Sequence, residues 1–322
     1  MSSFQLETIW VNAMLVKEIV EIKKGIQVFC DANTDQHSSR IWLSSGTTQE
    51  IESASDIIYR TDAFLPREPW REPSLTEYSL LRANEPILNL SSWDLGSSIG
   101  VVRFPNEVLA PLEAILENIR KSSAATLEEC QFLDTHPERE NAIAKVMKHV
   151  ERYCLSSNRL QLLGIQTTLP GLTTVTSGYH NSIPKKRYDG MHLDSWDRDT
   201  LRRRHKSRNR ICINLGCEER YFLFINLTLM DMFHALGLSD PEDIYKNYRG
   251  TSIGDKFMKS YPSYPVVKLK VAPGEAYIAP TENVIHDAST ISKKYSDITL
   301  TFLGYFGILP YAKDGILDCV MT

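Results

Sequence analysis

From about residue 160 onward, the chain is a succession of short β-type segments separated by loops that contain Gly, Pro, Asn, Asp or charged residues. These segments read LQLLGIQTTL, LTTVTSGY, GMHLD, RICINLG, RYFLFINLT, VVKLKV, EAYIAP, NVIHDAS and ITLTFLGYF. Many short strands at such spacing are typical of a sandwich, a barrel or a jelly roll. The sequence therefore predicts a mainly β core for this half of the chain.

Helical patterns interrupt and precede this succession. Residues 227–250 look helical, with Ser239 and the acidic residues after it as a helix start. Residues 106–121 and 139–153 carry apolar side chains at spacings of three and four, which places them on one face of a helix. We expect these two helices to pack against the core as supports.

The first hundred residues are mixed. Residues 26–32 and 40–45 read as strands, and residues 65–74 form a loop punctuated by prolines. We therefore expect a mixed α/β N-terminal region over 1–155 that packs on a core over 156–322, with a helical insert at about 227–262. The expected fold class is mainly β with flanking helices (α+β).

The composition excludes several classes of protein. A hydrophobic fraction of 42% and a charged fraction of 24% are those of an ordinary globular protein, and a net charge of −4 gives no pull toward nucleic acid. The chain has no apolar run of about 18 residues and no signal-peptide pattern. Its cysteines form no CxxC pair, which favours free thiols in a reducing compartment. We expect a cytoplasmic protein that binds neither nucleic acid nor a membrane; a homo-oligomer is left open.

The segment YDGMHLDSWD, residues 188–197, places His192 and Asp194 one residue apart. If GMHLD is a strand, these two side chains share a face and Leu193 points the other way. Downstream, His286 begins a strand in an otherwise apolar run. Two histidines and one carboxylate can bind one face of a metal ion and leave the other positions open, which favours Fe(II). The alternative is a polar strand edge plus a buried core histidine, without a metal.

Across residues 160–310 the chain resembles the Fe(II)/2-oxoglutarate-dependent oxygenases. The resemblance is carried by HLD, by the lone histidine after PGEAYIAP and by the following strand DITLTFLGYF. It implies a double-stranded β-helix, a jelly-roll and cupin-like core, in which His192, Asp194 and His286 hold Fe(II). It also implies 2-oxoglutarate as cosubstrate and O₂ as oxidant. The halogenating branch has Gly or Ala where this chain has Asp194, so the resemblance implies hydroxylation, desaturation or cyclisation.

One departure from the family pattern concerns the cosubstrate. Many members carry Arg or Lys about ten residues after the distal histidine, then Ser or Thr two residues later; here these positions are Asp297 and Thr299. Thr299 fits, but Asp297 has the wrong charge for an anionic cosubstrate. The basic residue can come from the preceding loop or, as in the JmjC-like branch, from another strand; the candidates are Lys293, Lys294, Arg210 and Arg220. We favour Arg220, because the planar guanidinium of arginine binds a carboxylate bidentately. The remaining alternative is that 2-oxoglutarate is not the cosubstrate.

Basic residues flank the expected metal segment, at 185–187 and through DRDTLRRRHKSRNR, residues 197–210. They indicate a solvated loop or a lid over an anionic substrate; a nucleic-acid contact is the third reading, and the net negative charge of the chain argues against it. The candidate substrate-binding residues are Tyr188, Trp196, His180 and Arg198.

No GxGxxG, P-loop, HExxH or GxSxG motif is present. The leading hypothesis is an oxygenase acting on a small molecule, such as an amino acid or a biosynthetic intermediate. The alternatives are a protein or peptide side-chain hydroxylase of JmjC-like type and a non-catalytic jelly-roll binding protein.

Overall fold

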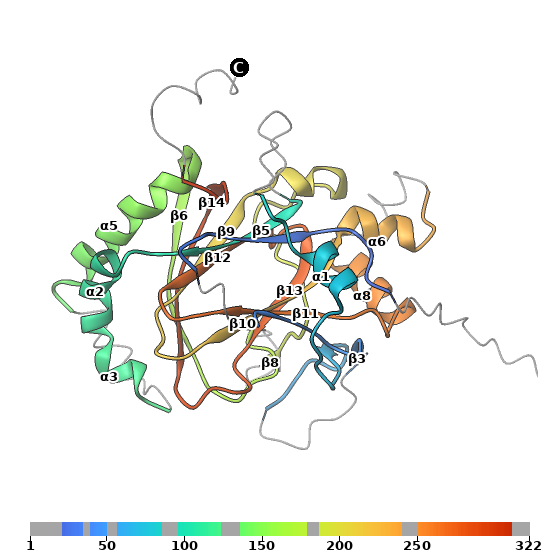
Figure 1. The fold of residues 1–322 in the computed structure, drawn as a ribbon, viewed down its shortest axis with the longest axis horizontal. Helices are drawn as coiled ribbons and strands as arrows, with labels where there is room; N and C mark the ends of the chain where they lie inside the picture. The colour runs from blue at the N-terminus through green and yellow to red at the C-terminus, as the bar shows by residue number, and fades with distance from the viewer. Residues whose placement is uncertain are drawn as a thin grey trace, which may run out of the picture.

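Two facing sheets form the centre of the molecule (Figure 1). The computed structural model describes residues 21–34, 39–49, 57–85, 96–123, 136–178, 187–239 and 250–310. The six-stranded sheet contains, in spatial order, β1 (Gln27–Cys30), β5 (Ser98–Arg103), β12 (Glu275–Ala279), β9 (Asn209–Asn214), β14 (Asp297–Phe306) and β6 (Cys154–Thr168). The four-stranded sheet contains β13 (Val284–Ser289), β10 (Arg220–Thr228), β11 (Val267–Val271) and β2 (Ile41–Leu43).

The chain passes back and forth between these two sheets. β9 lies in the six-stranded sheet, and the next two strands, β10 and β11, lie in the four-stranded sheet. β12 returns to the six-stranded sheet, β13 to the four-stranded sheet and β14 to the six-stranded sheet. Within both sheets the strand pairs are antiparallel, except for the parallel pair β1–β5. This order is that of a jelly roll, and the predicted fold class, mainly β with flanking helices, is confirmed.

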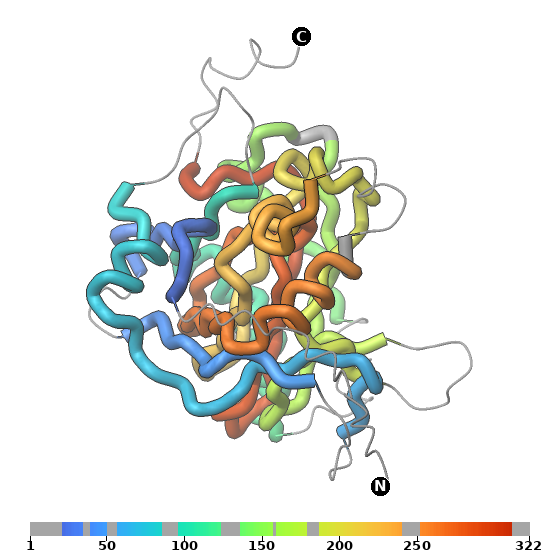
Figure 2. The backbone as a smooth tube through the Cα atoms, turned by 90° about the vertical axis from the view of Figure 1, so that its right-hand side faces the viewer, coloured from blue at the N-terminus to red at the C-terminus, as the bar shows by residue number. Residues whose placement is uncertain are grey.

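Three apolar layers follow from the alternation of side chains along each strand. On β10, Phe222 and Phe224 point between the sheets, whereas Leu223 and Ile225 pack on the outer face. That outer face is covered by α6 (Leu229–Ala235) and α8 (Gly250–Ser260). Figure 2, seen from the side of these two helices, shows them in front of the sheets. The interior between the sheets therefore stays separate from the helical cover.

The six-stranded sheet has its own helical cover, on the opposite side of the molecule in Figure 1. It consists of α2 (Asn106–Ile115), α3 (Glu117–Arg120) and α5 (Arg139–Val150), followed by a short 3-10 helix, η1 (Glu151–Tyr153). The two support helices predicted at 106–121 and 139–153 are therefore confirmed, although the first is divided at Leu116. The apolar stripe of each helix packs on the sheet.

Smaller elements complete the described chain. They are α1 (Leu75–Leu81), the pair β3 (Thr47–Gln49) and β4 (Phe64–Pro66), the pair β7 (Ser177–Gly178) and β8 (Arg187–Tyr188), and the 3-10 helix η2 (Leu201–Lys206). No helix among the described residues is both long and apolar enough to cross a membrane.

The N-terminal region contributes strands to both sheets. β1 and β5 extend the six-stranded sheet, and β2 extends the four-stranded one. The boundary between 1–155 and 156–322 stays a prediction. Both α6 and α8 fall within the predicted insert at about 227–262, and most of the helix start expected after Ser239 lies outside the described residues.

Two predicted strands are wrong. Of the described residues of LTTVTSGY, only Ser177 and Gly178 form a strand, the two-residue β7, and residues 172–176 are irregular. GMHLD does not form a strand; His192 makes a single antiparallel bridge with His286, and the residues on either side are irregular. Gly190 contributes to this, because it adopts a φ of +74° and a Cβ there would meet the Phe64 carbonyl oxygen at 2.6 Å. The segment thus touches the edge of the four-stranded sheet at one point only.

Candidate metal centre

The structure brings His192, Asp194 and His286 together. Each offers one ligand atom, and these atoms all lie within 4.8 Å of one another. The Nε2 atom of His192 lies 3.9 Å from Oδ1 of Asp194, and the Nε2 atom of His286 lies 3.7 Å from Oδ2. The side-chain arrangement predicted for a strand is therefore present, since Leu193 points away into the outer apolar layer.

Backbone hydrogen bonds set these ligands in place. His192 and His286 exchange two bonds across their bridge, with N–O distances of 3.0 and 2.8 Å, and the Asp194 N–H donates to the Thr281 carbonyl at 3.1 Å. On its other side His286 pairs with Phe224 of β10. His286 is thus part of a regular strand, whereas the other two ligands are held at single points.

A buried arginine holds the irregular ligand segment. Arg204, on η2, donates from Nη1 to the Asp194 carbonyl at 2.9 Å and from Nη2 to the Ser195 hydroxyl at 2.9 Å. It also forms an ion pair with Glu282 at 3.2 Å, and both side chains are buried. Glu282 in turn accepts hydrogen bonds from the backbone N–H groups of Trp196 and Asp197. Part of the predicted basic lid is therefore a fixed internal support.

The two imidazole rings have the same local orientation. Nδ1 of His192 lies 3.0 Å from the Gly190 carbonyl, and Nδ1 of His286 lies 3.0 Å from the Val284 carbonyl. A ring whose Nδ1–H donates to a carbonyl presents the lone pair of Nε2 to a metal. Both Nε2 atoms face the Asp194 carboxylate.

The charges around the three residues differ. Burial lowers the pKa of His286 to about 4, against the opposing charge of Asp194, so this ring is neutral at neutral pH. Burial acts in the same direction on His192, but the carboxylates of Asp287 and Asp194 outweigh it and raise its pKa to about 9. A metal cation bound here would therefore displace a proton from His192.

Asp194 is held ionised. Burial alone would raise its pKa, but the charges of Arg210, His286 and His192 lower it below the usual range. The guanidinium of Arg210 lies 2.6 Å from Oδ2, yet this buried oxygen accepts no well-aligned hydrogen bond among the described residues. An ionised carboxylate with an unsatisfied oxygen, facing two imidazole Nε2 atoms, fits a divalent cation, and the 2-His-1-carboxylate set is that of non-haem Fe(II) sites.

A second charged cluster lies deeper between the sheets. Nε of Arg220 lies 3.3 Å from Oδ2 of Asp297, and Nζ of Lys293 lies 3.0 Å from Oδ1 of the same carboxylate. All three side chains are buried, so two cations share one anion in a region of low polarity. Thr299 is the next residue of β14 that faces the same side as Asp297, since Ile298 and Leu300 pack against the helices.

The other basic candidates from the sequence lie elsewhere. Arg210 pairs with Asp194, and Lys294 is exposed, with its ammonium 5.3 Å from the Tyr295 ring centre. Among the substrate candidates, Tyr188 is half-buried against Tyr59, and Trp196 and Arg198 are exposed. His180 lies outside the described residues.

Sequence reasoning missed Asp287, Arg204 and Glu282. Asp287 follows His286 directly, and its Oδ2 lies 3.4 Å from Nδ1 of His192. No local motif marks these residues, because the pairs Asp287–His192 and Arg204–Glu282 join segments about eighty or more positions apart. The one available signal was the cluster of arginines after Asp194.

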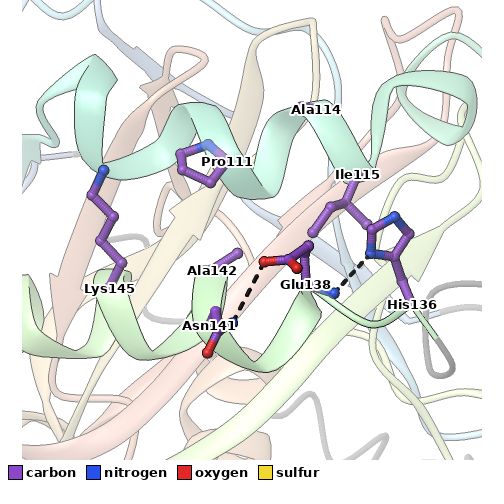
Figure 3. Close-up of a pocket in the computed structure, with 8 residues that line it drawn as sticks. All are labelled: Pro111, Ala114, Ile115, His136, Glu138, Asn141, Ala142 and Lys145. Atoms are coloured by element: carbon purple, nitrogen blue, oxygen red, sulfur yellow. Dashed lines mark hydrogen bonds between the residues drawn. The ribbon is translucent and has the colours of Figure 1, made fainter.

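A hollow of about 500 Å³ lies apart from these groups, between α2 and α5 (Figure 3). Its lining comprises Pro111, Ala114, Ile115, His136, Glu138, Asn141, Ala142 and Lys145. None of the three ligand residues borders it, so it is a feature of the helical cover rather than of the metal centre.

Comparison with known proteins gives structural matches only. No family model and no curated protein matches the sequence. Among solved structures, the chain is similar to the Kdo hydroxylase KdoO, a non-heme Fe(II) alphaketoglutarate-dependent dioxygenase. The apo form gives a TM-score of 0.32 at 12% identity, and the complex with alphaketoglutarate and Fe(III) gives 0.31 at 13%. Each match covers 66% of this chain and 81% of that one. Alphaketoglutarate is another name for 2-oxoglutarate.

Proposed function

We propose that the protein is a non-haem Fe(II)/2-oxoglutarate-dependent oxygenase that oxidises a small anionic molecule. One observation carries the proposal: His192, Asp194 and His286 bring their ligand atoms within 4.8 Å of one another inside a jelly roll. When bound, Fe(II) supplies the redox chemistry that couples O₂ and 2-oxoglutarate to the oxidation of a substrate C–H bond. The protein supplies the position of the ion and a site screened from bulk water.

The ligand residues prepare the site in different ways. Each imidazole is turned by its Nδ1 contact, so that Nε2 is available as a donor. Arg210 keeps Asp194 ionised and fixes one of its oxygens. Three protein ligands leave the other coordination positions for a cosubstrate and O₂.

Arg220 is the proposed partner of the remote carboxylate of 2-oxoglutarate. Arg220, Lys293 and Asp297 together carry one excess positive charge in the interior, and a buried net charge favours a bound counter-ion. Nη1 of Arg220 donates to Cys212 at 2.9 Å. Cys212 and Arg210 are alternate residues of β9, about 6.7 Å apart along the strand, which is of the order of the length of a five-carbon dicarboxylate. This spacing along β9 supports the assignment of Arg220 as the carboxylate partner.

Anaerobic reconstitution tests this proposal. Addition of Fe(II) and then 2-oxoglutarate to the metal-free protein should give a weak visible charge-transfer band, and O₂ should then yield succinate. Arg220→Met should keep Fe(II) binding and weaken 2-oxoglutarate binding by about 100-fold, which corresponds to about 2.8 kcal/mol. Lys294→Met is the matched control and should change neither. The absence of both the band and succinate from wild-type protein would refute the proposal.

The anionic substrate is proposed from the charges beside the metal segment. In residues 198–206, Arg198, Arg202, Arg203 and Lys206 are exposed, whereas Arg204 already has a carboxylate partner. Exposed Trp196 adds an apolar surface in the same segment. Such a group of basic side chains suits a carboxylate or a phosphate ester.

Two measurements test the anionic substrate. Succinate release should rise more with carboxylic acids than with their methyl esters, and the double variant Arg202→Glu/Arg203→Glu should raise KM with little change in kcat. Equal stimulation by acids and esters would contradict an anionic substrate.

A further inference from the structure

Asp287 is a second carboxylate beside the metal ligands. It follows His286 on β13, its side chain is fully buried, and its Oδ2 lies 3.4 Å from Nδ1 of His192. Within the described parts of the chain, Oδ2 has no hydrogen-bond partner by strict geometry, and its ion-pair contact is this ring nitrogen. Burying a carboxylate oxygen is costly unless a donor satisfies it. The ring of His192 is the cationic group that the structure places against this oxygen.

The other oxygen of Asp287 fixes the carboxylate itself. Oδ1 accepts hydrogen bonds from the N–H groups of Val175 at 3.0 Å and Thr176 at 3.2 Å, and from the Thr176 hydroxyl at 3.2 Å. The Thr176 carbonyl then accepts from the Asp189 N–H at 2.9 Å. Asp189 precedes Gly190, whose carbonyl is the other acceptor near Nδ1 of His192. Asp287 therefore joins β13, the 175–176 segment and the irregular ligand segment.

We infer that Asp287 is a positioning residue that fixes His192 as a metal ligand, an inference that rests on the proposed metal centre. Its Oδ2 and the Gly190 carbonyl together hold Nδ1 as the donor nitrogen, so the lone pair of Nε2 is directed toward the cation site. A carboxylate acceptor also makes the opposite nitrogen a stronger ligand. Among the described residues, the Val284 carbonyl is the hydrogen-bond acceptor at Nδ1 of His286, and the pairing of β13 holds this histidine in place.

Asp287→Asn separates this role from simple packing. Asparagine has nearly the same shape but only one acceptor oxygen, so it can satisfy either the Val175 and Thr176 donors or the His192 ring, not both. Titration of metal-free protein with Co(II), followed by visible absorption, should give a Kd about 10- to 100-fold higher than in wild type. The absorption spectrum should also change, because the ring no longer has a fixed orientation.

Two further variants make the outcome decisive. Thr176→Val removes one hydrogen bond to Oδ1 without touching His192, and it should keep a Kd within about twofold of wild type. His286→Ala should abolish binding. If wild type and His286→Ala bind Co(II) alike, or wild type does not bind it, the proposed metal centre fails. If His286→Ala loses binding and Asp287→Asn matches wild type, the metal centre stands and the role of Asp287 is overturned.

A measurement on wild type covers the case in which Asp287→Asn does not fold. Proton NMR of the Co(II)-loaded protein should show two strongly shifted, solvent-exchangeable imidazole N–H signals, one from each histidine. Selective loss of one signal in His192→Gln assigns it. The absence of an N–H signal from His192 would show that Nδ1 is not a donor, and it would overturn the inference.

Discussion

The two parts of the metal centre are built by different means. His286 lies within β13, where backbone pairing to β10 and the apolar contacts of its neighbours fix its position. His192 and Asp194 lie on an irregular segment that makes one backbone bridge and depends on Arg204, Glu282 and other polar side chains. Many small backbone and apolar contacts stabilise a strand, whereas a few buried charged groups stabilise the irregular segment.

This difference predicts how each part fails. Loss of an apolar neighbour of β13 should weaken the whole fold, because that strand belongs to the cooperative sheet. Loss of a polar support of the irregular segment should open that segment first. The three predictions below test this contrast, from the largest expected effect to the smallest.

Arg204→Met should have the largest effect. It leaves Glu282 buried without its cation and removes the donors to Asp194 and Ser195. Breaking a buried pair from one side costs about 3–5 kcal/mol. Hydrogen exchange should accelerate most in residues 192–208 and much less in β13, with a corresponding fall in the free energy of unfolding.

The double variant Arg204→Met with Glu282→Gln is the control for this prediction. A neutral glutamine can still accept from the N–H groups of Trp196 and Asp197, so part of the lost stability should return. Equal acceleration of exchange in β13 and in residues 192–208 would show that the two parts open together, and the contrast would be lost.

Ile285→Ala should have the next largest effect and act on the other part. Ile285 is buried on the outer face of β13, and α8 packs so closely there that a Cβ on Gly254 would come within 2.2 Å of its Cδ1. The cavity should cost about 3 kcal/mol of global stability, whereas Ile285→Val should cost about 1 kcal/mol. Chemical denaturation measures both. A local opening confined to residues 192–208 would contradict the assignment of β13 to the cooperative core.

The sequence predicted the regular part well. Short apolar segments bounded by Gly, Pro, Asn, Asp or charged residues identify β9, β10, β11, β12 and β14, because these strands bury side chains on both faces. His286 could be placed for the same reason, since it occurs within such a pattern. The β-rich core followed from these strands, whereas the juxtaposition of His192 and Asp194 with His286 was predicted from a strand that the structure does not form.

The irregular part could not be predicted in the same way. GMHLD has the alternation of a strand, but the positive φ of Gly190 and the contacts of Arg204 override that local preference. The partners of Arg204, Arg208 and Arg210 are Glu282, Asp197 and Asp194, and nothing in the run of basic residues indicates which arginines turn inward. Asp297 illustrates the same limit: its charge is wrong for the cosubstrate, but Arg220 and Lys293 make it part of a positively charged cluster.

Asp197→Asn should have the smallest effect and adds a pH dependence to the contrast. Asp197 accepts from the Arg208 side chain at 2.8 Å and from its backbone N–H at 2.9 Å. Burial alone would raise the pKa of Asp197, but these bonds and the charge of Arg208 lower it. A lowered pKa in the folded state stabilises the fold above the unfolded value of about 3.9, and this contribution is lost as the pH falls through the folded value. Wild type should therefore be more stable than the variant by about 1–2 kcal/mol at pH 7, with the difference closing below about pH 4. Urea denaturation from pH 7 to pH 3 measures the gap, and a gap that stays constant over this range would show that Asp197 acts through shape rather than charge.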